Sequence, residues 1–243
     1  MISIKFLGVS AFEVTTEKGL RVLIDPFVTG NPTCPIKVED ITEIDFILVS
    51  HAAIDHFGDA PEIARRTGAT ILCGPDVGTL VARMGVPKDQ IIMCCYGDLF
   101  EDSDIKVKCV KAEHVSVSNV NDVYMSGQPN GFVVYTESGI GIYHTGDTAI
   151  FGDMKLIGQL YQPRILLLGT GMWTDARSSP SGHLSISEAA LATQWIGPKV
   201  MIPHHGVEMN PEKAQELVRQ VNVMAPLVKT VILKPGETYS FGQ

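Results

Sequence analysis

The chain has 243 residues, 45% of them hydrophobic, and its formal net charge is −8. Acidic and basic residues are spread along the sequence without a basic stripe, so we expect no nucleic-acid partner. Apolar runs such as "RILLLG" are too short to cross a bilayer, and no linker divides the chain, which indicates one domain over residues 1–243 without a membrane span.

The N-terminal segments are predicted to form β-structure. Short alternating runs separated by turns with glycine predict strands at 3–8, 11–16 and 21–26. An apolar strand at 45–50 follows a loop rich in proline and glycine. The N-terminus lacks the basic region, apolar core and cleavage site of a signal peptide, so we expect a cytoplasmic protein.

Helices and strands are predicted to alternate in the next part of the chain. The segments 61–68 and 76–85 predict helices, each ending at a glycine that can adopt the left-handed conformation of a helix C-cap. Strands are predicted at 69–74 and 90–95. The cysteines form no C-x-x-C motif and mostly lie in apolar segments, so we interpret them as buried, reduced thiols: Cys34, Cys73, Cys94, Cys95 and Cys109.

A second β-rich stretch opens the C-terminal half, and helices follow it. A strand is predicted at 104–114, and a hairpin at 131–147 with its turn at Glu137-Ser138-Gly139. The next helix is expected to be capped by Ser185 or Ser187. The remaining segments are a helix at 185–197, a strand at 199–206, a helix at 211–224 and a strand at 230–241.

Two β-rich halves with interleaved helices predict the class of fold. Sheets that are apolar on one face must bury that face, and two such sheets can pack face to face with helices outside them. The sequence therefore predicts an α/β fold, a four-layer αββα sandwich.

Histidines and aspartates recur at the points where the predicted strands stop. Loops rooted in rigid strands can place several ligands within about 2 Å of one ion, and imidazole and carboxylate are common ligands of divalent metals. The recurrence therefore predicts a metal site at one edge of the sandwich. The candidate ligands are His51, Asp55, His56, His114, Asp147 and the pair His204-His205.

Six stretches occur in one characteristic order over nearly the whole chain: "VLIDPFVTGNP", "SHAAIDHFGDA", "AEHVS", "YHTGDTAIFGDMKLIG", "SGHLSISEAA" and "VMIPHHG". In this combination the chain resembles the metallo-β-lactamase superfamily, and within it the branch of small metal-dependent hydrolases related to L-ascorbate-6-phosphate lactonase. The resemblance implies the metallo-β-lactamase fold, which is the four-layer αββα sandwich. It is much less specific for the substrate.

The resemblance also implies a set of metal ligands. In the family's pattern, two metals each have three ligands of their own and share one aspartate. The first-metal positions align with His51, Ala53 and His114, the second-metal positions with Asp55, His56 and His205, and the shared aspartate with Asp147.

One of these positions departs from the family's pattern. The middle histidine of the signature H-x-H-x-D-H is Ala53 in this chain, and alanine cannot ligate a metal. We therefore expect a divalent metal, Zn²⁺ or Mn²⁺, bound at one tight site, and a second site that is weak or absent.

Four further polar residues lie beside these motifs. His183 matches a histidine in the family's stretch before the late helix, and it either contacts substrate, completes the depleted metal shell or hydrogen-bonds its own loop. His144 and His204 are interpreted as structural, with a supporting contact to the ligands as the alternative. Asp25 is expected to stabilise its own turn.

The metal determines the expected chemistry. A bound Zn²⁺ or Mn²⁺ lowers the pKa of its water from 15.7 to about 7, so hydroxide becomes available at neutral pH. We expect an enzyme, a metal-dependent hydrolase acting on a lactone, cyclic amide or ester of a small polar metabolite, with Asp55 and His183 in catalytic roles.

Two alternatives remain from the sequence. One is a phosphodiesterase or nuclease of the same fold, and the other is a metal-stabilised binding module whose catalysis has faded. The expected partner is a small-molecule substrate, and the sequence is compatible with a homo-oligomer.

Overall fold

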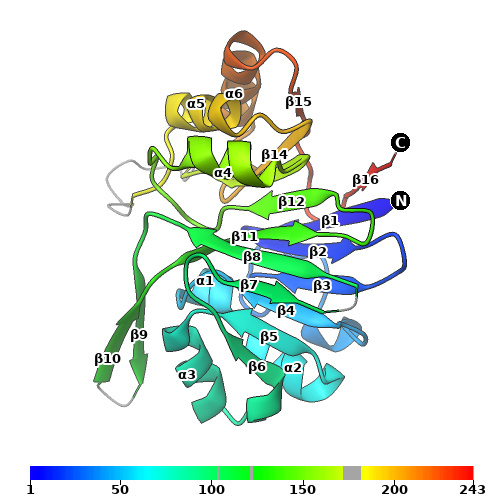
Figure 1. The fold of residues 1–243 in the computed structure, drawn as a ribbon, viewed down its shortest axis with the longest axis vertical. Coiled ribbons are helices and arrows are strands. Elements are labelled where there is room, and N and C mark those ends of the chain that lie inside the picture. Colours follow the sequence, from blue (N-terminus) through cyan, green and yellow to red (C-terminus); the bar gives the residue numbers. More distant parts are fainter. Residues whose placement is uncertain (103, 121–122, 172–181, 243) are drawn as a thin grey trace.

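Two facing sheets with helices on their outer sides form the molecule (Figure 1). The computed structural model describes residues 1–102, 104–120, 123–171 and 182–242. One seven-stranded sheet has the order β16-β1-β2-β3-β4-β5-β6, and the other has the order β15-β14-β13-β12-β11-β8-β7. This arrangement confirms the predicted α/β class, a four-layer αββα sandwich.

The first sheet is built mainly from the N-terminal half, together with the last strand of the chain. Its outer face is covered by helices α1 (Ile54–Phe57), α2 (Ala60–Thr67) and α3 (Pro75–Arg83). Short 3₁₀ helices lie at Val38–Asp40 and Lys88–Gln90. Its strands are β1 (Ile2–Gly8), β2 (Ala11–Thr15), β3 (Arg21–Ile24), β4 (Phe46–Val49), β5 (Thr70–Cys73), β6 (Ile91–Met93) and β16 (Thr238–Phe241).

The second sheet comes from the C-terminal half. Its outer face is covered by α4 (Met154–Tyr161), α5 (Ile186–Ile196) and α6 (Pro211–Met224). An arm of two paired strands, β9 (Ser116–Val120) and β10 (Val123–Gly127), projects from the sandwich (Figure 1). The strands of the sheet are β7 (Leu99–Glu101), β8 (Lys106–Lys111), β11 (Asn130–Tyr135), β12 (Gly141–His144), β13 (Ile165–Gly169), β14 (Val200–His204) and β15 (Lys229–Thr230).

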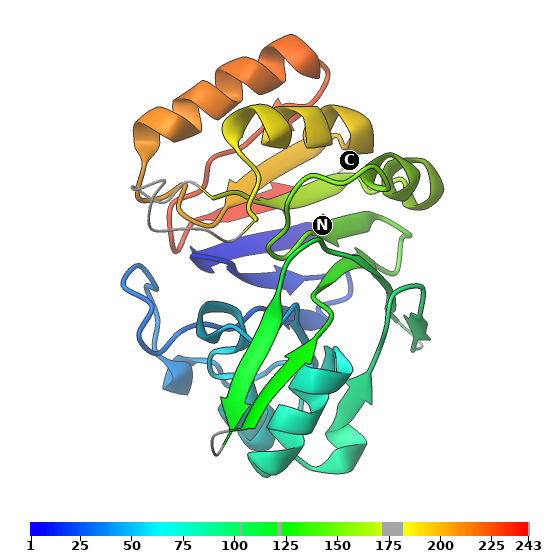
Figure 2. The same ribbon diagram turned by 90° about the vertical axis from the view of Figure 1, so that its left-hand side faces the viewer.

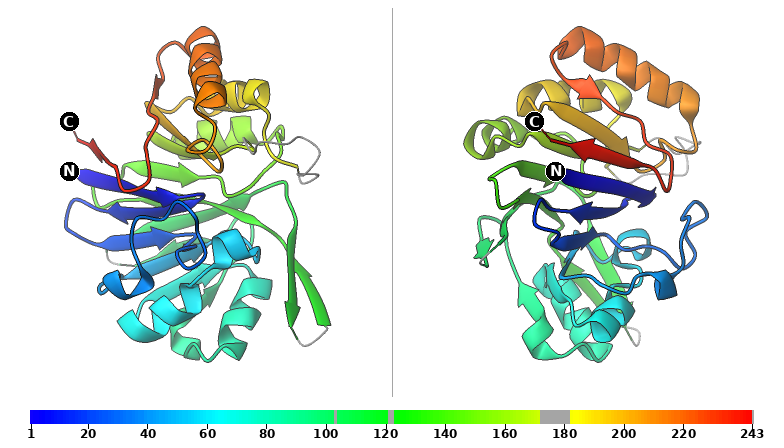
Figure 3. Two further views of the ribbon diagram at one scale, coloured as in Figure 1. Left: turned by 180° about the vertical axis from the view of Figure 1, so that it is seen from behind. Right: turned by 90° about the vertical axis from the view of Figure 1, so that its right-hand side faces the viewer.

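Three apolar layers hold the four structural layers together. Phe12, Leu48 and Phe132 belong to the core between the two sheets, where burial of apolar surface favours the folded state. Separate cores lie between each sheet and its helices. The views in Figure 3 show α4–α6 on one outer side and α1–α3 on the other. Among the described residues, no helix is long and apolar enough to cross a membrane.

The strand directions bring several loop starts to one edge. In the second sheet, β12, β13 and β14 pair in parallel, and β8 runs the same way because β11 pairs antiparallel with both β8 and β12. In the first sheet, β3, β4 and β5 are parallel neighbours. The carboxyl ends of parallel strands meet at one edge, where α/β proteins commonly bind ligands. This edge, with the arm beside it, faces the viewer in Figure 2.

Two hairpin turns at the opposite end of the sandwich are built alike and link the sheets. The turns at 16–20 and 136–140 share the pattern T-E-x-G with an apolar residue after it. Thr16 Oγ1–H donates to Glu137 at 2.5 Å, and Thr136 Oγ1–H donates to Glu17 at 3.2 Å. These reciprocal hydrogen bonds join β2–β3 of the first sheet to β11–β12 of the second, far from the strand-end edge.

Local predictions hold for most of the chain. Ser185 is the helix cap, with a complete capping box to Glu188, and Gly68 and Gly85 adopt the positive φ expected after their helices. All five cysteines are free, and Cys73, Cys94 and Cys109 are buried, but Cys34 is only partly buried and the predicted burial of Cys95 is wrong, because its side chain is exposed.

The single final strand predicted at 230–241 is wrong. The segment divides into β15, which joins the second sheet, and β16, which joins the first. Pro235 has no N–H for a ladder, and Gly236 turns the chain with φ 90°. Helix α1, helix α4 and the arm were not predicted.

Candidate metal centre

The predicted ligands lie close together at the strand-end edge. Three groups of side chains each have their ligand atoms within 4.8 Å of one another. The groups are His51 with His114 and Asp147, Asp55 with His56 and His205, and Asp147 with His183 and His205. The first two groups correspond to the ligand sets that the family resemblance implied, less the imidazole that Ala53 lacks.

Asp147, just after β12, lies at the centre of the cluster. Its Oδ2 is 2.9 Å from His183 Nε2, 3.1 Å from His56 Nε2, 3.2 Å from His205 Nε2 and 3.8 Å from His114 Nε2. Its Oδ1 is buried and has no hydrogen-bond partner among the described residues. One carboxylate thus connects all three groups.

Hydrogen bonds behind the cluster determine which nitrogen of two rings faces the site. The buried Asp25 carboxylate accepts from Ser50 N–H at 2.7 Å, Ser50 Oγ–H at 2.8 Å and His56 Nδ1–H at 2.7 Å. Because the Ser50 hydroxyl hydrogen is used there, Ser50 Oγ accepts from His51 Nδ1–H at 3.0 Å. Both histidines therefore present Nε2 to the cluster, the orientation typical of metal-binding rings.

Two site residues have a backbone conformation that is rare outside glycine. The φ angle is 47° at Asp25 and 68° at His205. His205 N–H donates to Val9 O at 2.8 Å, and Val9 N–H donates to Glu208 Oε1 at 2.8 Å. The β1–β2 turn of the first sheet therefore holds a candidate ligand of the second sheet in a conformation that it would otherwise rarely adopt.

Charges inside the cluster balance one another. Burial opposes ionisation of Asp147, but the neighbouring His205 and His56 outweigh it and hold the pKa of this carboxyl well below its ordinary value. Burial, with the adjacent His56, lowers the pKa of His51 to about 3. Burial also opposes protonation of His56, yet Asp147 and Asp25 raise its pKa well above the ordinary value. A metal ion held by His56 would therefore have to displace the proton that this raised pKa favours.

The donor set fits a divalent metal ion. His51 Nε2 and Asp147 Oδ1 are both buried without a hydrogen-bond partner in the described part of the chain. Leaving a buried polar atom unsatisfied costs about 1–3 kcal/mol, so two such atoms on neighbouring ligands point to a missing partner of positive charge. Imidazole nitrogen with carboxylate oxygen is the ligand chemistry of Zn²⁺, and it also accommodates Mn²⁺.

His183 lies on the side of the second ligand set. Its ring stacks on His205 with centroids 4.8 Å apart, and its Nε2 contacts Asp147. The ligand-atom groups place it with Asp147 and His205 and do not place it with His51 and His114. The His183 ring centroid also lies 5.1 Å from that of His114, and its completion of the depleted first set stays a prediction.

His144 and His204 lie behind the ligands as a stacked pair, with ring centroids 4.8 Å apart. His144 Nδ1 accepts from Gly146 N–H at 3.1 Å, and its Nε2–H donates to Ser10 O at 3.3 Å. His204 Nδ1 lies 3.2 Å from Ser10 Oγ. Protein groups use both nitrogens of His144, which agrees with a structural role.

Sequence reasoning missed the orienting role of Asp25 and Ser50. It predicted that Asp25 stabilises only its own turn, and it assigned no role to Ser50. In the structure, the Asp25 carboxylate also accepts a hydrogen bond from His56 Nδ1–H. Both residues stand at strand ends beside the predicted ligands, so the pattern that found the ligands also contained the signal for their supports.

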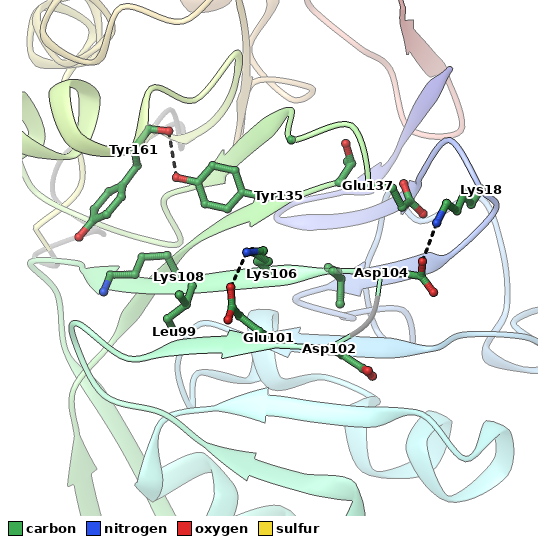
Figure 4. Close-up of a pocket in the computed structure, with 13 residues that line it drawn as sticks. Lys18, Leu99, Glu101, Asp102, Asp104, Lys106, Lys108, Tyr135, Glu137 and Tyr161 are labelled. Atoms are coloured by element: carbon green, nitrogen blue, oxygen red, sulfur yellow. Dashed lines mark hydrogen bonds and ion pairs between the residues drawn. The ribbon is translucent and has the colours of Figure 1, made fainter.

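A separate cavity of about 490 Å³ lies along β7, β8 and β11 (Figure 4). Charged side chains on its wall pair with each other, including Lys18 with Asp104 at 2.8 Å and Lys106 with Glu101. None of its lining residues belongs to the histidine and aspartate cluster. We therefore assign the chemistry to the cluster.

Comparisons with known proteins agree with a metal centre. The family model of the beta-lactamase superfamily domain matches residues 20–206. A UPF0173 metal-dependent hydrolase of Methanosphaera stadtmanae is 37% identical over 245 residues, covering 98% of this chain and 99% of that protein. One from Archaeoglobus fulgidus is 37% identical and covers 100% of both. The structure of a metallo hydrolase from the archaeon Ignicoccus hospitalis matches with TM-score 0.81 and 30% identity, covering 99% of each chain.

Asp25→Asn should weaken metal binding by about 10–100-fold, the usual effect of removing a support behind a ligand. Asparagine tolerates the left-handed backbone, but its amide cannot accept all three hydrogen bonds. Competition with a metal-sensitive dye measures the affinity. Asp59→Asn is the matched control, because Asp59 accepts from Val28 and Thr29 N–H without a histidine contact. Equal losses in the two variants would contradict the orienting role.

Proposed function

The chain is a metal-dependent hydrolase that belongs to the beta-lactamase superfamily, and we propose that its substrate is a lactone, cyclic amide or related ester of a small polar metabolite. The predicted metallo-β-lactamase resemblance is thus confirmed at the level of the family. The relation to L-ascorbate-6-phosphate lactonase stays a prediction.

The observation that carries the proposal is the sharing of Asp147 between two groups of ligand atoms. Asp147 forms one group with His51 and His114, and its Oδ2 lies 3.1 Å from His56 Nε2 and 3.2 Å from His205 Nε2, which belong with Asp55 to the other group. We propose that these six residues, Asp147 included, hold the metal. Such a site suits attack by water on a carbonyl or phosphoryl group, because no protein nucleophile is needed.

When bound, a divalent ion supplies a water of lowered pKa and polarises the oxygen of the bond under attack. Asp55 is half-buried, and its Oδ2 lies 3.4 Å from His205 Nε2. Burial opposes its ionisation, but the hydrogen bond with His205 keeps the pKa of Asp55 below the ordinary value. Asp55 is therefore an ionised acceptor at neutral pH that can take a proton and return it to the leaving group.

His183 is proposed to act on the substrate. Its Nε2 contacts Asp147 Oδ2 at 2.9 Å, and its side chain is only partly buried. An imidazole there can orient the reacting oxygen or stabilise charge that develops on it.

Ala53 is proposed to make the two ligand sets unequal. The first set keeps His51, His114 and the shared Asp147, whereas the second has Asp55, His56 and His205, and Asp147 also contacts its two histidines. A set with fewer protein ligands leaves more positions for water or substrate. We propose one tightly held ion, Zn²⁺ or Mn²⁺, and a second that is weak or absent at limiting metal.

Protein loaded with Zn²⁺ or Mn²⁺ should hydrolyse a member of a panel of lactones, cyclic amides and esters, and a chelator should abolish the activity until metal is restored. Asp147→Ala should lose both turnover and metal, because Asp147 connects the two ligand sets. Turnover of phosphodiesters alone would replace the proposed substrate class with the nuclease alternative. Full metal loading without hydrolysis of any panel member would favour the binding module.

His183→Ala should lower kcat while the tight ion remains bound, because His183 lies outside the two proposed ligand sets. Metal content and steady-state kinetics are measured on the same preparation, with His144→Ala as a comparison at a histidine behind the site. Loss of all bound metal in His183→Ala would make this residue a primary ligand.

Ala53→His should raise the occupancy of the weaker site, because it restores an imidazole at the position where the family has one. Titration calorimetry gives the metal-to-protein ratio and the stepwise affinities. Ile54→His is the matched control, since Ile54 is the next residue, exposed at the start of α1. Two equally tight ions in the unchanged protein would overturn the proposed inequality.

A further inference from the structure

A buried carboxylate outside the ligand groups lies near the segments that carry His51 and His114. Asp76, in the first turn of α3, is 8% exposed. Its Oδ2 accepts the hydroxyl hydrogen of Ser116, and its Oδ1 has no hydrogen-bond partner among the described residues. A buried charge is costly unless it is satisfied, so its presence at this place requires an explanation.

Ser116 connects the Asp76 carboxylate to the loop that carries His51. Its side chain is fully buried, and its Oγ accepts from Ala52 N–H at 3.1 Å. Ala52 is the residue next to His51, and Ser116 is two residues after His114. A continuous chain of hydrogen bonds therefore runs from Asp76 through Ser116 to the Ala52 amide. It joins the loop that carries His51 to the segment that follows His114.

Two glycines in the surrounding backbone leave room for the Asp76 carboxylate. Gly127, paired with Ser116 across the arm, lies so close to Asp76 that an added Cβ would collide with the carboxylate. A Cβ on Gly74 would lie 2.9 Å from Asp76 Oδ1. The arm root and the start of α3 thus enclose Asp76 where it meets Ser116.

We propose that Asp76 is a positioning residue for the first ligand set, acting through Ser116; the inference rests on the proposed metal-dependent function. A carboxylate acceptor polarises the Ser116 hydroxyl and strengthens its acceptance of Ala52 N–H, because hydrogen bonds in a chain reinforce one another. This fixes the separation of the loops that present His51 and His114.

The first ligand set depends on this support more than the second. It lacks the imidazole at Ala53, so fewer protein–metal bonds hold its loops in place. The second set instead has Asp25 behind His56 and Val9 behind His205. Loss of the Asp76–Ser116–Ala52 chain should therefore weaken the first set selectively.

The test compares Ser116→Ala, Asp76→Ala and Asp76→Asn in the full-length protein. Ser116→Ala and Asp76→Ala should weaken the lower-affinity metal step by about 10–100-fold and leave the tight step unchanged. In metal-free protein, hydrogen exchange at the Ala52 amide should accelerate. Asp76→Asn keeps an acceptor for Ser116 and should restore most of the affinity. The double variant should be no worse than Ser116→Ala alone, because the two side chains act in series.

Ser118→Ala is the matched control. Ser118 lies two residues further along the same face of β9, and its Oγ is buried without a hydrogen-bond partner among the described residues. An equal loss of metal affinity in Ser118→Ala, or an equal loss in both metal-binding steps, would mean that the substitutions only destabilise the β9–β10 arm. Either result would overturn the inference. Unchanged affinity and exchange in Ser116→Ala would also overturn it. Failure of the unchanged protein to bind metal would instead reject the proposed function.

Discussion

The structure depends on keeping one carboxylate, Asp147, ionised inside the protein beside four imidazoles. Its Oδ2 lies within 3.8 Å of the Nε2 atoms of His56, His114, His183 and His205. Such a group is stable in a dry environment only when positive charge compensates it. A proton on His56 supplies that charge without metal, and a metal ion can take its place.

The rest of the fold supplies the geometry that this arrangement needs. Strands of both sheets end at one edge, so loops distant in sequence bring their side chains together there. Neighbouring segments then fix individual ligands: Val9 of the first sheet holds the backbone of His205 in the second, and Asp25, after the adjacent strand of the same sheet, holds the ring of His56. The left-handed backbone at Asp25 and His205 is tolerated because these contacts determine it.

The sequence predicted the fold class and gathered the candidate ligands, because strand periodicity and the polar residues at strand ends are local patterns. It did not predict contacts between segments that meet only in the folded chain. Asp25 was given its own turn alone: its place at a strand end makes it a candidate, but its hydrogen bond with His56 forms only in the folded chain. His183 was a candidate for the gap at Ala53, and its contact with His205, which comes from a distant part of the chain, is not visible in the sequence. The break at Pro235-Gly236 was visible, yet the apolar residues on both sides favoured one strand.

Anomalous diffraction at the zinc absorption edge tests the central claim most directly, using crystals of protein prepared with one equivalent of zinc. The account predicts a strong peak among Asp55, His56, Asp147 and His205, and a weak peak or none between His51 and His114. A principal peak away from Asp147, or two peaks of equal height, would contradict it.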